Sequence, residues 1–313
     1  MRMNQAPFEG RDYQLYGWRV RSELPLPQAW AGGEDESPVD IVIRLGEVPD
    51  KLIDIVHSTP FLQIARNGDC RLEIVAAGKY QVRQGREVIV QPAPGATMAE
   101  ISVFLLGSVV GLLCHQRGLF PLHASCVRIG DGAVAFCGPS GAGKSTLAAS
   151  LVRRGHSLLC DDITIIDSFA SIGSRVRPAM PRMRLWRDSL EALQVPPGSL
   201  QRDRIELEKY VLPATNIGGF STEPLPLRAI FMLQSAKSPQ LEGAFQMKSM
   251  EAVASLGEQV YRRRQSYVLG RRAALFHEAT RIADAVPVMY LARRLDFGLL
   301  DETAERVEEL AGV

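Results

Sequence analysis

Hydrophobic and polar residues alternate through much of the first 95 residues, a pattern typical of half-buried β-strands. Turn residues at 67–69, 77–78 and 84–86 separate the alternating segments. The strands expected from this pattern are 16–21, 39–45, 61–64, 71–75, 79–83 and 87–91. We therefore expect a β-rich N-terminal domain over residues 1–95, arranged as an antiparallel meander that ends at the linker 92–95.

The pattern changes after this linker. Residues 101–114 form an uncharged apolar run of 14 residues, whereas a membrane-spanning helix needs about 20. The run therefore predicts a buried helix and no membrane partner.

The rest of the chain mixes short apolar runs with segments of helical spacing. Gly130-Asp131-Gly132 predicts a tight turn, so the strands on either side of it should form a hairpin. The expected strands are 122–129, 132–137, 156–160, 163–166, 224–233 and 286–291, and the expected helices are 146–152, 249–264, 271–284 and 300–311. This order predicts an α/β domain over residues 96–313.

The segment 138–145, Gly-Pro-Ser-Gly-Ala-Gly-Lys-Ser, fits the phosphate-binding pattern GxxxxGK[ST] at every fixed position. It lies between a predicted strand and a predicted helix, which directs the helix N-terminus at a phosphate. Lys144 supplies a positive charge, and the Ser145 hydroxyl can bind Mg²⁺. The residues expected to hold the nucleotide are Gly138, Ser140, Gly141, Ala142, Gly143, Lys144, Ser145 and Thr146.

Two adjacent carboxylates, Asp161 and Asp162, end a predicted strand 16 and 17 residues after Ser145. In phosphate-loop proteins a carboxylate at the end of a neighbouring strand holds Mg²⁺. The second carboxylate can accept the proton of an attacking hydroxyl, because a serine hydroxyl is a weak acid and needs a positioned base.

Two further features are candidates for the same site. His123 begins the strand that pairs with the strand carrying the loop, and a neutral imidazole there could orient a catalytic aspartate. Arginines also gather in the segment 175–187, which either binds phosphate or an acidic substrate or is a solvated irregular segment. These arginines are Arg175, Arg177, Arg182, Arg184 and Arg187.

The composition of the chain bears on its partners and on its location in the cell. The formal net charge of the 313 residues is +1, which gives no electrostatic reason to expect a nucleic acid. The five cysteines are scattered without metal-binding spacing, which indicates reduced thiols in a cytoplasmic protein. The first residues lack the apolar core of a signal peptide.

The stretch 122–162 resembles the catalytic core of HPr kinase/phosphorylase in three motifs. These are a histidine 15 residues before the phosphate loop, the loop itself, and Arg154-Gly155-His156 followed by the double aspartate. The resemblance implies a mixed phosphate-loop sheet with flanking helices, as in phosphoenolpyruvate carboxykinase, and the use of ATP and Mg²⁺. It also implies that Asp161 is the catalytic base with His123 as its hydrogen-bonding partner, and that Ser145 and Asp162 are metal-site residues.

The chain also departs from that family. Thr146 stands where the family has an acidic residue, and the second family signature is not visible. These departures argue against HPr itself as the substrate. The opening 16–27 and the segment 122–125 look more like divergent relatives, some of which are lasso-peptide tailoring kinases that phosphorylate a C-terminal serine.

We therefore expect a kinase that phosphorylates a serine hydroxyl on a peptide or small protein, with Lys144, Asp161 and His123 in the catalytic machinery. The N-terminal domain would recognise the peptide, and the resemblance implies a homo-oligomer. A small-molecule kinase and a nucleotide-binding regulatory module without phosphoryl transfer are the alternatives.

Overall fold

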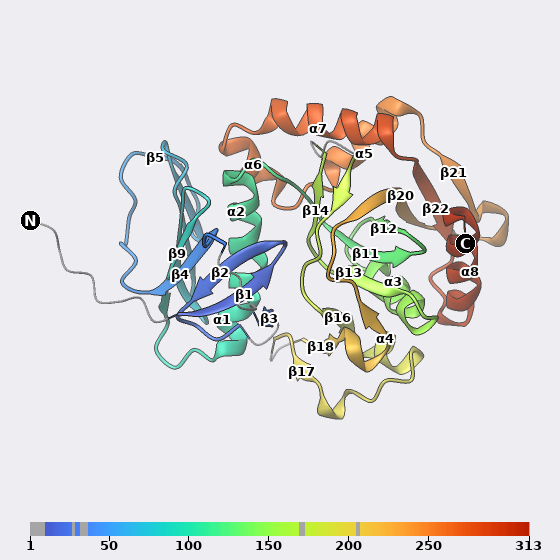
Figure 1. Ribbon diagram of the computed structural model, residues 1–313, viewed down its shortest axis with the longest axis horizontal. Helices are drawn as coiled ribbons and strands as arrows, with labels where there is room; N and C mark the ends of the chain where they lie inside the picture. Colours follow the sequence, from blue (N-terminus) through green and yellow to red (C-terminus); the bar gives the residue numbers. More distant parts are fainter. Residues whose placement is uncertain (1–9, 27–28, 32–36, 169–172, 205–206, 313) are drawn as a thin grey trace, which may run out of the picture. The chain divides into compact units, whose positions relative to one another are not determined.

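The computed structural model describes residues 10–26, 29–31, 37–168, 173–204 and 207–312 (Figure 1). The chain divides into two compact units, Met1–Arg117 and Gly118–Val313, which are described separately below.

Among the described residues, the first unit contains one sheet with the strand order β3-β1-β2-β4-β9-β8-β7-β6-β5. Tyr16 and Gly17 form the turn between the first two strands, so the strand predicted at 16–21 begins only at Trp18. The strands are β1 (Arg11–Leu15), β2 (Trp18–Ser22), β3 (Trp30–Ala31), β4 (Ile41–Leu45), β5 (Ile55–Ser58), β6 (Leu62–Ala65), β7 (Cys70–Ile74), β8 (Gly78–Arg83) and β9 (Glu87–Pro92).

The predicted antiparallel meander is correct only for part of this sheet. Strands β5 to β9 pair antiparallel in chain order, but β4 pairs parallel with both β2 and β9. The β4–β9 pair joins strands that are separated in sequence by β5 to β8. Alternation of hydrophobic and polar residues indicates where a strand lies but not which strand it pairs with. The parallel pairs of β4 could therefore not be predicted from the sequence.

The apolar run forms a helix that is longer than predicted and irregular. It consists of α1 (Met98–Phe104), a π-helical segment η1 (Leu105–Val109) and α2 (Val110–Gln116). A capping box between Thr97 and Glu100 begins it. By length and composition the helix could cross a membrane, yet 72% of its apolar window is buried within the fold, in agreement with the expected buried helix.

This helix belongs to the first compact unit, whereas we had expected it to begin the second domain. The Tyr80 hydroxyl donates a 3.1 Å hydrogen bond to the Ile101 carbonyl oxygen, and Gln116 donates to the Val82 carbonyl oxygen. These two bonds join the helix to strand β8 of the same unit. The compact units divide after Arg117 and not at residue 95.

In the second unit, the described residues of the large sheet follow the order β10-β14-β15-β20-β12-β11-β13-β19, and β22 and β21 extend it beside β20. Its strands are β10 (Phe120–Leu122), β11 (Ala124–Ile129), β12 (Gly132–Cys137), β13 (Ser157–Cys160), β14 (Thr164–Asp167), β15 (Arg175–Val176), β19 (Gly219–Phe220), β20 (Leu225–Ser235), β21 (Gly243–Gln246) and β22 (Val288–Arg293). A smaller sheet has the order β16-β18-β17 and consists of β16 (Arg182–Trp186), β17 (Gln201–Arg202) and β18 (Lys209–Pro213).

The large sheet is mixed, as expected. Strand β12 pairs antiparallel with β11 through the predicted hairpin and parallel with β20. Strand β20 also pairs parallel with β22. Because β12, β20 and β22 run in the same direction, their carboxyl ends lie at one edge of the sheet, where the phosphate loop begins.

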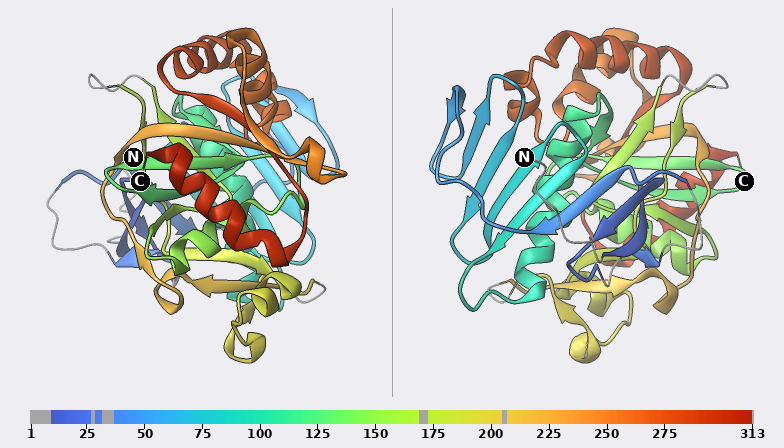
Figure 2. Two further views of the ribbon diagram at one scale, coloured as in Figure 1. Left: turned by 90° about the vertical axis from the view of Figure 1, so that its right-hand side faces the viewer. Right: turned by 60° about the vertical axis from the view of Figure 1, so that its left-hand side comes forward.

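Helices pack on both sides of this sheet (Figures 1 and 2). Helices α3 and α8 lie on one side, with Leu147, Leu151 and Val307 in the shared core, and α5 and α7 lie on the other. The helices are α3 (Lys144–Arg153), α4 (Arg187–Ala192), α5 (Ser249–Glu258), α6 (Arg263–Val268), α7 (Arg272–Ala285) and α8 (Leu300–Ala311), with short 3₁₀ turns η2 (Pro197–Ser199), η3 (Ala214–Asn216), η4 (Pro239–Leu241) and η5 (Phe297–Leu299).

The helix predicted over 249–264 is instead two helices, α5 and α6. Arg262 has a left-handed φ of 54°, and Val260 forms a β-bridge with Leu122. The Tyr261 N–H donates to the Pro121 carbonyl oxygen at 2.8 Å. Pairing with β10 therefore interrupts the helix, and it brings the segment 259–261 next to His123.

Candidate active site

The phosphate loop follows β12 and precedes α3, in agreement with the strand–loop–helix order expected from the sequence. Gly138, Gly141 and Gly143 have positive φ angles of 144°, 82° and 80°. A side chain at Gly138 would place its Cβ 2.9 Å from the Leu233 carbonyl oxygen, so space as well as conformation requires a glycine there. The free N–H groups at the start of α3 border this loop and can bind a phosphate.

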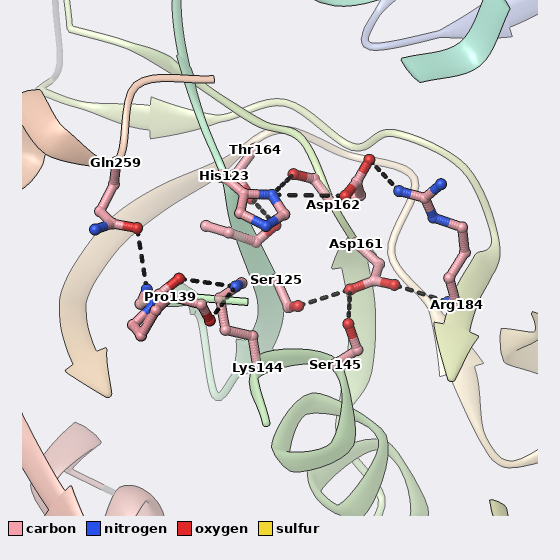
Figure 3. A network of polar contacts seen from close by, with 12 residues as sticks. His123, Ser125, Pro139, Lys144, Ser145, Asp161, Asp162, Thr164, Arg184 and Gln259 are labelled. Atoms are coloured by element: carbon pink, nitrogen blue, oxygen red, sulfur yellow. Dashed lines mark hydrogen bonds and ion pairs between the residues drawn. The ribbon is translucent and has the colours of Figure 1, made fainter. Parts of the chain in front are cut away.

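Lys144 is the first residue of α3, and its side chain is buried. The Nζ atom donates hydrogen bonds to the carbonyl oxygens of Gly138 (2.8 Å) and Pro139 (3.1 Å), as Figure 3 shows. Burial lowers the pKa of Lys144 from its ordinary value. The amino group is thus held within the loop, where a bound phosphate would meet it.

Asp161 lies at the end of β13 and accepts three hydrogen bonds (Figure 3). Its Oδ1 accepts from the hydroxyls of Ser125 (2.6 Å) and Ser145 (2.7 Å), and its Oδ2 accepts from the backbone N–H of Arg184 (2.8 Å). Cys126 pairs with Cys160 in the antiparallel β11–β13 ladder, so the next residues along, Ser125 and Asp161, also face each other. The sheet register therefore positions this carboxylate against the phosphate loop.

Asp162 points in a different direction because its backbone is left-handed, with a φ of 77°. Its carboxylate forms an ion pair with Arg184, and its Oδ1 lies 3.5 Å from Nδ1 of His123. Burial opposes ionisation of Asp162, but the positive charge of Arg184 and the neighbouring His123 outweigh it, so the pKa of this carboxyl is lowered. Arg184 also contacts Asp203 at 3.5 Å, which gives its guanidinium a second anionic partner.

His123 lies between β10 and β11. Its backbone N–H donates to the Gln259 carbonyl oxygen at 2.8 Å, its ring centroid lies 5.9 Å from that of Tyr261, and its Nδ1 lies 3.0 Å from the Asp162 carbonyl oxygen. Burial, assisted by the charge of Lys144, lowers the pKa of His123 below the ordinary value of 6.5. The imidazole is therefore neutral at neutral pH.

This pKa shift predicts a dependence of stability on pH. Below pH 6.5 an unfolded His123 binds a proton that the folded protein does not, so its contribution to the free energy of unfolding is full above pH 6.5. The contribution is lost as the pH falls through the lowered pKa. Urea unfolding of metal-free protein between pH 7 and pH 5 should show a smaller loss of stability for His123→Asn than for the wild type. Equal losses in the two proteins would contradict the assignment.

Each of the two aspartates contacts the residue that the sequence resemblance assigned to the other. We expected His123 beside Asp161 and Ser145 beside Asp162, but His123 contacts Asp162 and Ser145 contacts Asp161. The physical reason is the left-handed backbone at Asp162, which turns its side chain away from the loop and toward the β10–β11 junction.

Sequence reasoning did not select Ser125 or Gln259 as site residues. The Oε1 atom of Gln259 accepts a 3.2 Å hydrogen bond from the N–H of Gly138, so it holds the first residue of the loop (Figure 3). Gln259 lay inside a predicted continuous helix, and no local signal marks it. Ser125 could have been found from strand alternation, because it lies two residues after His123 and opposite the strand that ends in Asp161.

The arginine-rich segment contributes one residue to the site. Arg184 reaches both carboxylates, through its side chain and through its backbone N–H. Other arginines of the segment bond elsewhere: Arg175 to the Pro224 carbonyl oxygen, Arg177 to Asp167 and Arg187 to Glu208. The segment is thus mainly structural, with β16 carrying Arg184 to the site.

A pocket of about 420 Å³ surrounds the loop and the carboxylates. Thr146 lies at its edge, with Oγ1 2.9 Å from Oγ of Ser189 in α4. The pocket wall also includes Trp186, Lys209 and Arg293, which the sequence did not assign to the nucleotide. This volume is within the range of small-molecule sites.

No group of three or more histidine, cysteine, aspartate or glutamate side chains that could hold a metal occurs among the described residues. A Mg²⁺ ion does not require one, because it is commonly bound through one or two protein oxygens together with water and substrate phosphates. The Ser145 hydroxyl and the Asp161 carboxylate, 2.7 Å apart, are suitable oxygen donors.

Comparison with known proteins finds a distant relationship. HPr kinase/phosphorylase of Pelodictyon phaeoclathratiforme (strain DSM 5477 / BU-1) is 38% identical over 80 residues, which are 23% of this chain and 24% of that protein. The chain thus matches about a quarter of the length of this relative. The match confirms the resemblance predicted from the sequence. No family model matches the chain.

Among solved structures, the Hpr(Ser) kinase/phosphatase from Coxiella burnetii aligns with 61% of this chain and 90% of its own chain, at 13% identity and a TM-score of 0.31. The assignment of a mixed α/β architecture rests on the strand order itself.

Proposed function

Because the chain is a distant relative of HPr kinase/phosphorylase, a phosphotransferase family, we propose that it is an ATP- and Mg²⁺-dependent kinase for a serine hydroxyl on a peptide or small protein. One observation carries this proposal. The Ser145 hydroxyl of the phosphate loop bonds to Asp161 at 2.7 Å, and the Asp162–His123–Arg184 cluster lies beside this pair in the same pocket. This arrangement supports neighbouring positions for the metal, the triphosphate and the acceptor.

The contacts favour a division of tasks between the two carboxylates. Both oxygens of Asp161 already accept hydrogen bonds, one of them from Ser145, so Asp161 suits the metal. Asp162 carries the more exposed carboxylate, at 18% of its side-chain surface, and lies beside His123. It suits the acceptor hydroxyl. When bound, Mg²⁺ would neutralise negative charge on the phosphates.

In the proposed reaction the serine oxygen forms a bond to the γ-phosphorus, and the bond from that phosphorus to the β,γ-bridging oxygen breaks. The serine proton passes to Asp162, and the bridging oxygen leaves with ADP. Lys144 and the N–H groups of the loop stabilise the developing charge on the phosphate. The neutral imidazole of His123 holds the backbone and carboxylate of Asp162 in place.

Transfer of label from γ-labelled ATP tests this function. The protein is incubated with Mg²⁺ and a panel of serine-containing peptides, some with serine at the C-terminus, and with small hydroxyl compounds. Label on a peptide serine is the expected result. Label only on a small compound would favour a small-molecule kinase, and tight ATP binding without transfer to any acceptor would favour a regulatory module.

The first unit offers a surface for the peptide. Strand β5 is an edge of its sheet, and apolar side chains near it are exposed, including Ile53 (91%) and Phe61 (62%). Ile55 and Val56 of β5 itself are exposed as well. Exposed apolar edge strands are normally avoided because they pair with other chains. We infer that an extended segment of the substrate adds to β5 as a further strand.

A pair of charged substitutions tests this edge. In the variant Ile55→Lys with Val56→Lys, repulsion and hydration at the edge should raise the KM for the peptide about tenfold or more, with kcat and ATP affinity unchanged. Val75→Lys is the matched control, because Val75 is 90% exposed but lies after β7 and not on β5. An unchanged KM in the double variant, or an equal change in the control, would place the peptide elsewhere.

Several finer expectations remain predictions. The acceptor that the sequence resemblance implies is the C-terminal serine of a lasso-peptide precursor, and homo-oligomers are expected by the same resemblance. We also propose a reducing cytoplasmic location, which the five free and buried cysteines support.

A further inference from the structure

Arg293, the last residue of β22, carries a buried positive charge next to the phosphate loop. Its side chain is 7% exposed, and its Nη2 donates a 2.9 Å hydrogen bond to the Ala142 carbonyl oxygen. Its Nε has no hydrogen-bond partner, and no carboxylate within the described part of the chain forms an ion pair with it. Burial lowers the pKa of Arg293 from its ordinary value.

Two other buried or half-buried arginines have an acidic partner. Arg184 is paired with Asp162 and Asp203, and Arg71 with Glu73. A buried charge without a partner is costly, and such groups are normally paired. The described part of the fold does not supply an anion for Arg293, so we expect a bound anion to provide this partner.

The position of Arg293 indicates where this anion would bind. A Cβ atom on Gly143 would lie only 2.4 Å from Nη2 of Arg293, so the guanidinium packs directly against the phosphate loop. Arg293 also lines the pocket that contains Lys144 and Ser145. Guanidinium groups bind phosphate through paired N–H donors, and the free Nε can supply one of these.

The residues that follow Arg293 give the same wall of the pocket an apolar surface. Leu295 and Phe297 line the pocket and are 56% and 46% exposed, and Leu300 at the start of α8 lines it as well. The Asp296 carboxylate accepts a 2.8 Å hydrogen bond from the Gly298 N–H, which fixes the turn that presents Phe297. An exposed aromatic ring beside a phosphate site fits a flat heterocyclic base.

A second aromatic residue of the pocket, Trp186, is less suitable for a base. Trp186 lies two residues after Arg184 on β16, and the Lys209 ammonium lies 5.7 Å from its ring centroid. Arg184, on the same strand, pairs with Asp162 beside His123, where the acceptor would bind.

We propose that residues 293–300 form the nucleotide-binding wall of the pocket, with Arg293 bonding a phosphate oxygen and the surface of Leu295 and Phe297 holding the base. This inference rests on the proposed function, because it takes the loop to be a nucleotide site. Beyond the phosphate loop, it names the residues that would let the site distinguish a nucleotide from a simple polyphosphate.

Calorimetric titration of the full chain with two ligands, Mg²⁺–ATP and Mg²⁺–tripolyphosphate, tests the proposal. Arg293→Met should weaken the binding of both ligands at least tenfold, because both carry phosphate. Phe297→Ala should weaken the binding of ATP about tenfold and leave the affinity for tripolyphosphate unchanged. Phe276→Ala is the matched control, because Phe276 is 52% exposed but lies on α7 and does not line the pocket.

The thermal unfolding of the ligand-free proteins separates binding from a structural role. Loss of an unpaired buried charge should leave the Tm of Arg293→Met equal to or above that of the wild type. If Arg293→Met has a lower Tm and unchanged affinities for both ligands, Arg293 only stabilises the conformation of the loop, and its assignment to the phosphate is wrong. Arg293→Lys, which keeps the charge, should retain most of the tripolyphosphate affinity.

Other outcomes are also decisive. Unchanged ATP affinity in Phe297→Ala, or a selective loss of ATP affinity in Trp186→Ala instead, would overturn the base site. Equal weakening of both ligands by Phe297→Ala would also contradict it. A wild-type protein that binds neither ligand would refute the proposed function itself, whereas a wild type that binds both and variants that do not change would refute only this inference.

Discussion

Lys144→Met is expected to lower turnover on the order of 10³-fold and to raise the Kd for Mg²⁺–ATP at least tenfold. The Nζ of Lys144 lies within the loop on the carbonyl oxygens of Gly138 and Pro139, so a bound triphosphate would take its hydrogen bonds without movement of the backbone. Methionine keeps the length of the side chain and removes the charge. Calorimetry and the labelled-ATP transfer assay measure the two effects.

The fold should tolerate this change. Among the described residues no carboxylate forms an ion pair with Lys144, and removal of a buried unpaired charge is often neutral for stability. Lys237→Met, at an exposed position after β20, is the control and should change neither quantity. A Lys144→Met protein with wild-type Tm and wild-type ATP affinity would show that the loop is not the triphosphate site.

The second large effect concerns the two aspartates, which should respond differently to Mg²⁺. Asp161→Asn should lower turnover by roughly 10²–10⁴ and raise the Mg²⁺ concentration that gives half-maximal rate, because Asp161 lies beside Ser145. Asp162→Asn should lower turnover by a similar factor with the Mg²⁺ requirement unchanged, because it removes the proton acceptor. Initial rates measured over a range of Mg²⁺ concentrations distinguish the two.

Asparagine keeps the shape of each side chain, and Arg184 retains Asp203 when Asp162 is neutralised. Asp203→Asn serves as the control, because Asp203 contacts the same guanidinium without lining the pocket; its effect on turnover should be below about tenfold. If Asp162→Asn raises the Mg²⁺ requirement and Asp161→Asn does not, the assignment implied by the sequence resemblance is correct and the exchange proposed above is wrong.

Much of the second unit could be predicted because its signals are local. The glycine pattern of the phosphate loop, the apolar runs before it and the helical spacing after it all describe neighbouring residues, and the structure contains β12, the loop and α3 in that order. The Gly130–Gly132 turn likewise predicted the β11–β12 hairpin. Each of these features depends on backbone conformation and on contacts within a few residues.

The remaining features depend on contacts between distant parts of the chain. Local alternation could not show that β4 pairs parallel with β9, and helical spacing could not show that pairing of Val260 with Leu122 interrupts the helix before α6. That interruption brings Gln259 to the loop. No pattern near Arg293 marks it as a neighbour of Gly143, because 150 residues separate them in sequence.

The sequence by itself determined which residues can do the chemistry: the loop glycines, Lys144, Ser145 and the paired aspartates. Only the tertiary structure decided how they are combined. The left-handed backbone at Asp162 directs its carboxylate to His123 and Arg184, while Asp161, directly after β13, lies beside Ser145. Residue identity fixes charge and hydrogen-bonding capacity, but the direction of a side chain follows from the backbone and from the strands packed against it.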